Sequence, residues 1–343
     1  MPRTRYVVIG AGAIGGAIGG RLAHAGLDAV LVARGEHLAV LQRDGLRLRT
    51  PDEDVTVPVH AVGGPEQLLL GPDDVLVVAT KTQQAPDALV AWADAPVHED
   101  GRPAGTAGER LPVLMALNGV ASEAMALRYF SRVYGVCVWM PAVHLRPGEV
   151  ILRGAPRSGM LHIGRVPAQV DAHDEALLAQ VQRDLSAANY DVPLPADVMP
   201  WKYRKLISNL GNIFQALVHG NGDTASLTAL AVAEARAVLD GAGIACTSDE
   251  DERAARDAGF TMHEVPGVAS DVGGSTWQSL TRGTGNVETD YLNGEIALIA
   301  HRTGQLAPVN ARLATLARQA AASGMKPGAM SAEQLAGRLG LAQ

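Results

Sequence analysis

The chain has 343 residues, of which 47% are hydrophobic, and its formal net charge is −7. This length favours two domains, and the acidic balance offers no broad basic surface for nucleic acid. The sequence contains no run of about 18 apolar residues, so no membrane span is predicted. Only two cysteines occur, Cys137 and Cys246, in unrelated contexts. Their spacing predicts no metal site and no disulfide framework, and it favours a reducing cytoplasm.

The first part of the chain alternates short apolar segments with helical or turn-rich stretches. These segments are apolar throughout, as are strands buried on both faces of a parallel sheet. They cover residues 6–10, 29–34, 75–80, 112–117 and 133–140. We therefore predict an α/β domain over residues 1–192. Within it, residues 97–110 are polar and rich in Gly and Pro, which is typical of a surface loop.

Beyond about Val192 the strand signals fade, and Ala- and Leu-rich segments with helical periodicity follow. We predict an all-α second domain over residues 193–343. Its expected helices cover residues 201–217, 227–243, 248–259, 289–304 and 310–324.

A glycine-rich turn, GAGAIGG, stands between the first expected strand and a helical segment. Gly10, Gly12 and Gly15 have the spacing with which a Rossmann-type fold binds a dinucleotide. The turn and the following helix N-terminus would hold the pyrophosphate, so Ala13 and Ile14 join the cofactor-binding set. The alternative is a turn that is rich in glycine only for packing.

The end of the second strand separates the two nicotinamide cofactors. Arg34 stands where a cation would bind the 2′-phosphate of NADP, so NADP(H) is favoured. The alternative is that Arg34 is an ordinary surface residue. Glu36 would then bind the ribose hydroxyl of NAD.

Two later strand ends carry polar residues at the edge where such a sheet binds ligands. Lys81 follows one strand, and Asn118 with Gly119 follows the next. Together they are expected to line the nicotinamide end of the groove. Taken singly, each is more often a solvated lysine or a turn asparagine.

The stretch WKYRKLISNLGN, residues 201–212, combines cations with two asparagines. On one continuous helix over residues 201–217, Lys205, Asn209 and Asn212 would lie within about 60° of one another. Asparagine is a poor choice inside a helix, so a polar face towards solvent and a functional site are both open.

Several motifs together resemble the ketopantoate reductase family. They are GAGAIGG, TK near residue 80, LNG near 118, WxxxKLxxN over 201–209, and STWQ with ETDYLNG between 275 and 294. The resemblance implies a Rossmann domain that binds NADPH and a helical domain that closes over it. It also implies reduction of 2-dehydropantoate (ketopantoate) to pantoate, in pantothenate and coenzyme A biosynthesis.

The resemblance also assigns roles to residues. The catalytic lysine of the family matches Lys205, and its helix asparagine matches Asn209. Its serine and glutamate match Ser275 and Glu288, and its cofactor-domain lysine and asparagine match Lys81 and Asn118. Two departures stand out. Ile213 stands where the family has a second asparagine, and Asn212 lies one position earlier. The segment between Ser275 and Glu288 is one residue longer than in the family.

The expected chemistry follows from the residue types. A protonated Lys205 would stabilise the alkoxide that forms when hydride reaches a ketone carbon, and would supply the proton. Glu288 would keep that ammonium charged. The alternative for Glu288 is a helix-terminal acid, at a helix beginning near Thr289.

The leading hypothesis is an NADPH-dependent reductase of a small 2-oxo acid, ketopantoate. A related enzyme for another oxo acid and a nicotinamide-binding regulator without turnover are the alternatives. We expect no nucleic-acid or membrane partner, and a homodimer is left open.

Overall fold

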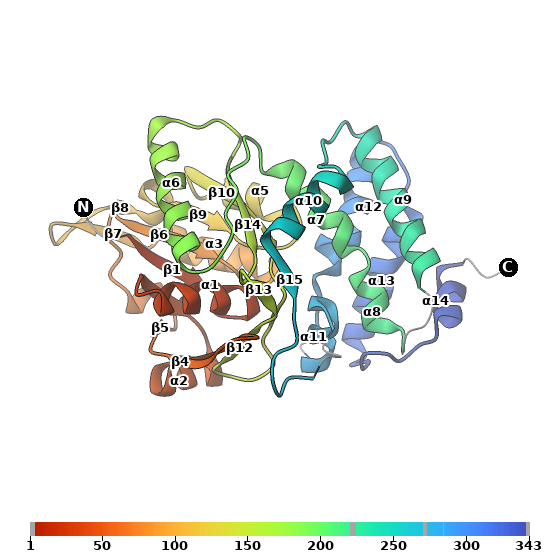
Figure 1. Ribbon diagram of the computed structural model, residues 1–343. Coiled ribbons are helices and arrows are strands. Elements are labelled where there is room, and N and C mark those ends of the chain that lie inside the picture. Colours follow the sequence, from red (N-terminus) through yellow and green to blue (C-terminus); the bar gives the residue numbers. More distant parts are fainter. Residues whose placement is uncertain (1–3, 220–223, 270–272, 284, 341–343) are drawn as a thin grey trace. The chain divides into compact units, whose positions relative to one another are not determined.

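The computed structural model describes residues 4–219, 224–269, 273–283 and 285–340 (Figure 1). The chain forms two compact units, and neither is a single run of sequence. The first comprises Met1–Leu117, Ala121–Trp201 and Asp249–Val268. The second comprises Asn118–Val120, Lys202–Ser248 and Ala269–Gln343.

A seven-stranded sheet forms the centre of the first unit, in the order β14-β10-β9-β6-β1-β2-β5. Its neighbouring strands are parallel except for β14, which is antiparallel to β10. All five predicted strands lie in this sheet. The bounds are β1 Arg5–Ile9, β2 Asp28–Val32, β5 His60–Val62, β6 Asp74–Val78, β9 Pro112–Met115, β10 Arg132–Trp139 and β14 Met160–Val166.

The central strands are buried on both faces, as their continuous apolar sequences predict. In β1, Tyr6 and Val8 belong to one hydrophobic cluster, and Val7 and Ile9 belong to the other. The second cluster includes α3 (Ala85–Ala93) and α5 (Ser122–Ala126), whereas the first includes α1 (Ala13–His24) and α6 (Ala172–Ala187). Helices therefore cover both faces of the sheet, as in a Rossmann-type domain.

Helix α1 packs between this sheet and a second one of four strands, ordered β11-β12-β3-β4. A Cβ atom on Gly19 would lie 2.2 Å from Leu31 of β2, and one on Gly20 would lie 2.5 Å from Leu46. The glycines of α1 thus allow close packing on two sides. The small sheet comprises β3 Leu46–Arg49, β4 Asp54–Val57, β11 Ala142–Val143 and β12 Glu149–Leu152, and α2 (Gly35–Asp44) precedes it in the chain.

The prediction of a surface loop over residues 97–110 is wrong. This stretch forms a hairpin of β7 (Pro96–Glu99) and β8 (Arg102–Thr106), followed by α4 (Ala107–Arg110). Asp100 and Gly101 at its tip both have positive φ, 51° and 75°. An Asp-Gly pair favours such a two-residue turn, and this local signal outweighs the polar composition.

Residues 249–268 also belong to the first unit, although their sequence lies within the helical half. They contain α10 (Asp249–Gly259) and β15 (Phe260–Met262). β15 pairs antiparallel with β13 (Gly154–Pro156). The strand pairing explains why this segment packs with the first unit.

The second unit is helical, as predicted, around a core contributed by α8, α9, α11, α13 and α14. Buried Ile213, Phe214 and Leu217 project from α8 into this core. The bounds are α7 Met199–Asn209, α8 Asn212–Leu217, α9 Ala225–Gly241, α11 Ser275–Arg282, α12 Asn293–Arg302, α13 Pro308–Ala322 and α14 Ala332–Leu339, and the unit also contains the 3-10 turn η3 Glu288–Tyr291. A further 3-10 turn, η2 Thr82–Gln84, belongs to the first unit.

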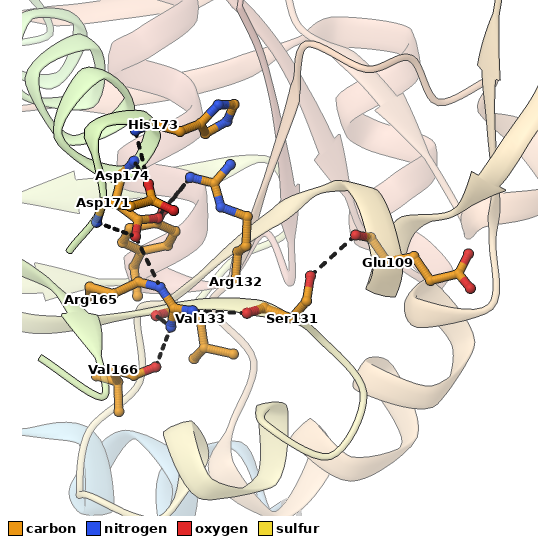
Figure 2. Close-up of polar contacts among 10 residues, drawn as sticks. Glu109, Ser131, Arg132, Val133, Arg165, Val166, Asp171, His173 and Asp174 are labelled. Carbon is orange, nitrogen blue, oxygen red and sulfur yellow. Dashed lines mark hydrogen bonds and ion pairs between the residues drawn. The ribbon is translucent and has the colours of Figure 1, made fainter. Parts of the chain in front are cut away.

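A charged network ties together the start of β10, the end of β14 and the start of α6 (Figure 2). Arg132 donates to Asp174 at 2.7 Å, and buried Tyr134 donates to the same carboxylate. Burial by itself would raise the pKa of Asp174, but these hydrogen bonds outweigh it and hold the pKa below its usual value. The network lies at the amino end of a parallel strand, opposite the edge where such sheets bind ligands.

Candidate active site

The glycine-rich turn joins β1 to α1 with the geometry of a phosphate-binding turn. Gly10 has a φ of +100°, and a Cβ there would lie 2.9 Å from Thr80. A Cβ on Gly15 would lie 2.1 Å from the carbonyl oxygen of Gly10, so this position also requires glycine. Apart from Gly12 and its two chain neighbours, no atom of the described residues lies within 4 Å of a Cβ built on Gly12, so the approach to the turn is open there.

The turn lies where the strand order reverses direction, between β1 and β6. Thr80 and Lys81 follow the carboxyl end of β6, beside the turn. Within the described residues, the buried hydroxyl of Thr80 has no hydrogen-bond partner. An open glycine turn, a helix N-terminus without a side-chain cap and this hydroxyl fit a dinucleotide pyrophosphate.

Arg34 lies at the end of β2 and precedes the first turn of α2. Both Arg34 and Glu36 are exposed. A cation and a carboxylate are therefore both available beyond β2, and the choice between NADP and NAD stays a prediction.

The prediction of one continuous helix over residues 201–217 is wrong, because two helices form there. α7 ends at Asn209 and α8 begins at Asn212, separated by a break at Leu210 and Gly211. Glycine and asparagine are weak helix formers, which favours a break at this point. Asn212 therefore does not continue the face of α7 that carries Lys205 and Asn209.

Lys205 and Asn209 are one turn apart on α7, so they share a face. Lys205 is half-buried and Asn209 is only 7% exposed. The Asn209 amide donates to the side-chain oxygen of Asn118 at 3.2 Å. The side chains of two predicted site residues, Asn118 and Asn209, are thus directly joined, although they are 91 residues apart.

The LNG turn also reaches the segment that contains Glu288. Gly119 has a φ of +78°, and a Cβ there would lie 2.7 Å from the carbonyl oxygen of Tyr291. Tyr291 ends η3, the 3-10 turn that Glu288 begins. Close backbone packing at Gly119 therefore brings Asn118 near the turn of Glu288.

Glu288 is 5% exposed. The helix expected near Thr289 begins later, at Asn293, because a 3-10 turn intervenes. Glu288 is therefore outside the first turn of α12, but it is an acid in the first turn of η3, so the alternative role as a helix-terminal acid stays open.

Asn212 and Ser275 come close to each other through Gly274. A Cβ on Gly274 would lie 3.5 Å from the side-chain oxygen of Asn212. Gln215 of α8 accepts a hydrogen bond from the Gly274 amide at 2.9 Å, just before Ser275 begins α11. Asn118 thus lies with Asn209 and the Glu288 turn, and Asn212 lies beside Gly274, the residue before Ser275.

Three further residues were missed in the sequence. Partial burial lowers the pKa of the Arg282 guanidinium, although the residue as a whole is exposed, and the Glu288 carboxylate partly offsets that effect. Arg282 therefore lies within electrostatic range of Glu288. Thr80 and His37, which contact the glycine-rich turn, were also missed. A polar residue after a buried strand was a usable signal for Thr80, whereas Arg282 and His37 have no local signature.

Comparison with known proteins now decides the family. Residues 6–168 match the family described as "Ketopantoate reductase PanE/ApbA", and residues 197–321 match its C-terminal counterpart. The chain belongs to the ketopantoate reductase family. Members of this family are dinucleotide-binding oxidoreductases.

Individual ketopantoate reductases are distant in sequence. The 2-dehydropantoate 2-reductase of Pyrococcus horikoshii is 27% identical over 207 residues, which span 60% of each chain. The Pyrococcus abyssi enzyme of the same name is 26% identical over 315 residues, covering 89% of this chain and 94% of the other.

Solved structures share the fold over almost the whole chain. The ketopantoate reductase of Ralstonia eutropha has a TM-score of 0.73 and 26% identity, covering 94% of this chain and 99% of that one. D-mandelate dehydrogenase, solved with NADH and anilino(oxo)acetate, has a TM-score of 0.74 at 21% identity over 94% of this chain and 99% of that one. One fold thus serves more than one 2-hydroxy acid.

Two further features concern the described residues alone. None of the helices there combines the length and the apolar character needed to cross a membrane. In the same residues, no group of three or more His, Cys, Asp or Glu side chains is arranged to hold a metal ion.

Proposed function

We propose that this ketopantoate reductase family member uses NADPH to reduce 2-dehydropantoate to pantoate, in pantothenate and coenzyme A biosynthesis. The observation that carries the proposal is the hydrogen bond from Asn209 to Asn118. Asn209 lies one helical turn from Lys205 on α7. A lysine beside one buried and one half-buried carboxamide suits a substrate that has a ketone and a hydroxyl.

The chemistry requires a hydride and a proton. A bound reduced nicotinamide dinucleotide supplies the hydride to the ketone carbon. The Lys205 ammonium donates a hydrogen bond to the ketone oxygen and then gives it a proton, so that the alkoxide becomes a hydroxyl. Glu288 favours the charged form of Lys205 and orients it.

Binding of the substrate is assigned to the polar side chains of the second unit. Asn118 and Asn209 would bind the terminal hydroxyl of ketopantoate, since a carboxamide both donates and accepts. Ser275 and Asn212 are the further substrate-binding residues of the proposal. Arg34 and Lys81 would contact the cofactor, together with Gly10, Gly12, Ala13, Ile14 and Gly15.

Two alternatives remain distinct from this proposal. The shifted Asn212 and the longer segment before Glu288 favour a related reductase for another 2-oxo acid. A regulator that binds the dinucleotide without turnover would not need a proton donor such as Lys205. A homodimer and a cytoplasmic location stay predictions.

The deciding experiment measures NADPH oxidation with a panel of 2-oxo acids. The analogue 2-oxo-3,3-dimethylbutanoate lacks the terminal hydroxyl of ketopantoate. A site built for that hydroxyl leaves its own polar groups unpaired with the analogue, so kcat/KM should be lower by at least about 100-fold. Similar efficiencies would point to another oxo acid.

Asn209→Ala tests the hydroxyl assignment. It should reduce kcat/KM for ketopantoate and leave the analogue nearly unchanged, so the gap between the two substrates narrows. Ser208→Ala is the matched control, because Ser208 is exposed on the same helix and contacts Arg204. An equal loss for both substrates in Asn209→Ala would contradict the assignment.

A further inference from the structure

His37 of α2 uses both ring nitrogens to join separate segments of the first unit. Its Nε2 lies 2.7 Å from the carbonyl oxygen of Ala11, and the Gly148 amide donates to its Nδ1 at 2.9 Å. An Nδ1 that accepts a hydrogen bond carries no proton, so Nε2 must carry it in the neutral ring. His37 therefore donates to Ala11, and these two bonds define its tautomer.

Ala11 is the residue between the first two glycines of the cofactor turn. It is 2% exposed, and its amide donates to the carbonyl oxygen of Val32 at 2.9 Å. The His37 bond adds a partner for the carbonyl oxygen. Both backbone polar groups of Ala11 are thus held by protein atoms.

Holding the Ala11 carbonyl also orients the next amide. The carbonyl of Ala11 and the N–H of Gly12 belong to one planar peptide group and point in opposite directions. His37 therefore directs the Gly12 N–H away from α2. Gly12 is the position where the turn is open, because among the described residues only its own chain neighbours lie within 4 Å of a built Cβ.

The other partner of His37 is firmly held. Gly148 has a φ of +73°, and a Cβ there would lie 2.3 Å from Val40 of α2. Its carbonyl oxygen accepts from the Arg47 amide at 2.8 Å, which fixes it to the small sheet. The ring of His144 also packs on His37, with centroids 4.5 Å apart. These contacts fix the position of the His37 imidazole, whose Nε2 then lies within hydrogen-bond distance of Ala11 in the glycine-rich turn.

We propose that His37 is a positioning residue for the dinucleotide: it holds the Ala11–Gly12 peptide so that the Gly12 N–H faces the pyrophosphate. The role rests on the dinucleotide binding of the proposed function. His37 does not touch the reacting atoms. Its loss should weaken cofactor affinity and spare the chemical step.

Three substitutions distinguish the effect of the His37 bond to Ala11 from the effect of its bond to Gly148. His37→Gln retains a donor at the distance of Nε2, so it can still reach Ala11. His37→Asn retains an acceptor near Nδ1 for Gly148 and loses the donor to Ala11. His37→Phe keeps the ring volume and loses both bonds. Gln42→Ala is the matched control, because Gln42 on the same helix donates to the carbonyl oxygen of Ala61 at 3.0 Å, outside the turn.

The Kd of NADPH is measured by titration for each purified protein, together with kcat and the KM of the oxo acid at saturating NADPH. We expect His37→Phe and His37→Asn to raise the Kd about tenfold, the usual effect of losing one such hydrogen bond. His37→Gln should recover most of the affinity. In all three, kcat and the KM of the oxo acid should stay within about twofold.

Three results would overturn the proposal: an unchanged Kd in His37→Phe, an equal rise in Gln42→Ala, or a loss confined to kcat. An unmutated protein that binds neither NADPH nor NADH would overturn it as well. Failure of the proposed function would give a different result in these measurements. A protein that binds NADPH but reduces no 2-oxo acid removes the substrate assignment, while the Kd series still decides the role of His37.

Discussion

At the scale of single residues, Lys205 carries the proposed proton transfer. Lys205→Ala should lower kcat by roughly 10² to 10⁴, the usual contribution of a positioned acid, and leave NADPH binding nearly unchanged. Because only the ammonium form donates, turnover of the unmutated enzyme should also fall at alkaline pH. Rates of single-turnover NADPH oxidation measure the effect.

Arg204 provides the control for this prediction. It is another cation on α7, and its guanidinium donates to Ser208 at 2.8 Å on the same helix. Arg204→Ala should keep kcat near normal. Near-normal turnover in Lys205→Ala would instead mean that the polar face of α7 is only a solvated surface.

Arg34 is the residue that should select the cofactor. Arg34→Ala should weaken NADPH binding by about 1 kcal/mol and leave NADH binding unchanged, because only NADPH has a 2′-phosphate. We expect this modest value because Arg34 is exposed and water screens its charge. Titration of both cofactors with both proteins measures it.

Glu36 offers the opposite outcome for the same experiment. If Glu36 binds the ribose hydroxyls, Glu36→Ala should weaken NADH more than NADPH. Equal affinity of the unmutated protein for both cofactors would contradict the preference assigned to Arg34.

At the scale of elements, the close packing of α1 makes a prediction about stability. A methyl group on Gly19 would lie 2.2 Å from Leu31 and 3.4 Å from Val8, in the core beneath the helix. Gly19→Ala should therefore destabilise the first unit by about 1 to 3 kcal/mol, as overpacking does. Denaturant unfolding followed by circular dichroism measures the change.

Gly337 of α14 is the control for this prediction. It is exposed, and beyond its two chain neighbours and the backbone of its own helix no atom of the described residues lies within 4 Å of a built Cβ. Gly337→Ala should stabilise the helix by about 0.5 to 1 kcal/mol, since alanine is the better helix former. Stabilisation by both substitutions would contradict close packing at α1.

At the scale of the whole molecule, a buried neutral histidine makes folding sensitive to acid. His162 of β14 is 1% exposed, stacks on Trp201 at 4.0 Å, and has no hydrogen-bond partner among the described residues. Burial lowers its pKa from 6.5 to about 4. Between these values the unfolded chain is protonated and the folded chain is not, so stability falls as pH falls.

The expected loss is about 2 kcal/mol between pH 7 and pH 5, because each unit below 6.5 costs about 1.4 kcal/mol. Burial lowers the pKa of His37 as well, so that residue acts in the same direction. His162→Phe keeps an aromatic ring against Trp201 and should flatten the dependence of unfolding free energy on pH. Parallel curves for the two proteins would contradict the assignment.

Local sequence patterns were sufficient for much of this protein. Continuous apolar runs predicted the parallel sheet, because only strands buried on both faces need them. The spacing of Gly10, Gly12 and Gly15 predicted the cofactor turn from backbone requirements alone. The motifs around Lys205 and Glu288 led to the correct family. The hairpin over residues 96–106 was also local, but its Asp-Gly signal was overlooked.

Only the tertiary structure joined residues that are far apart in the chain. No period or motif pairs Asn118 with Asn209 or His37 with Gly148, because such contacts depend on how strands and helices pack. The break after Asn209 differs, because glycine and asparagine favour it locally, and this signal was overlooked when one helix was predicted over residues 201–217. Sequence therefore specified the types of the site residues and their local backbone, and packing decided which of them meet.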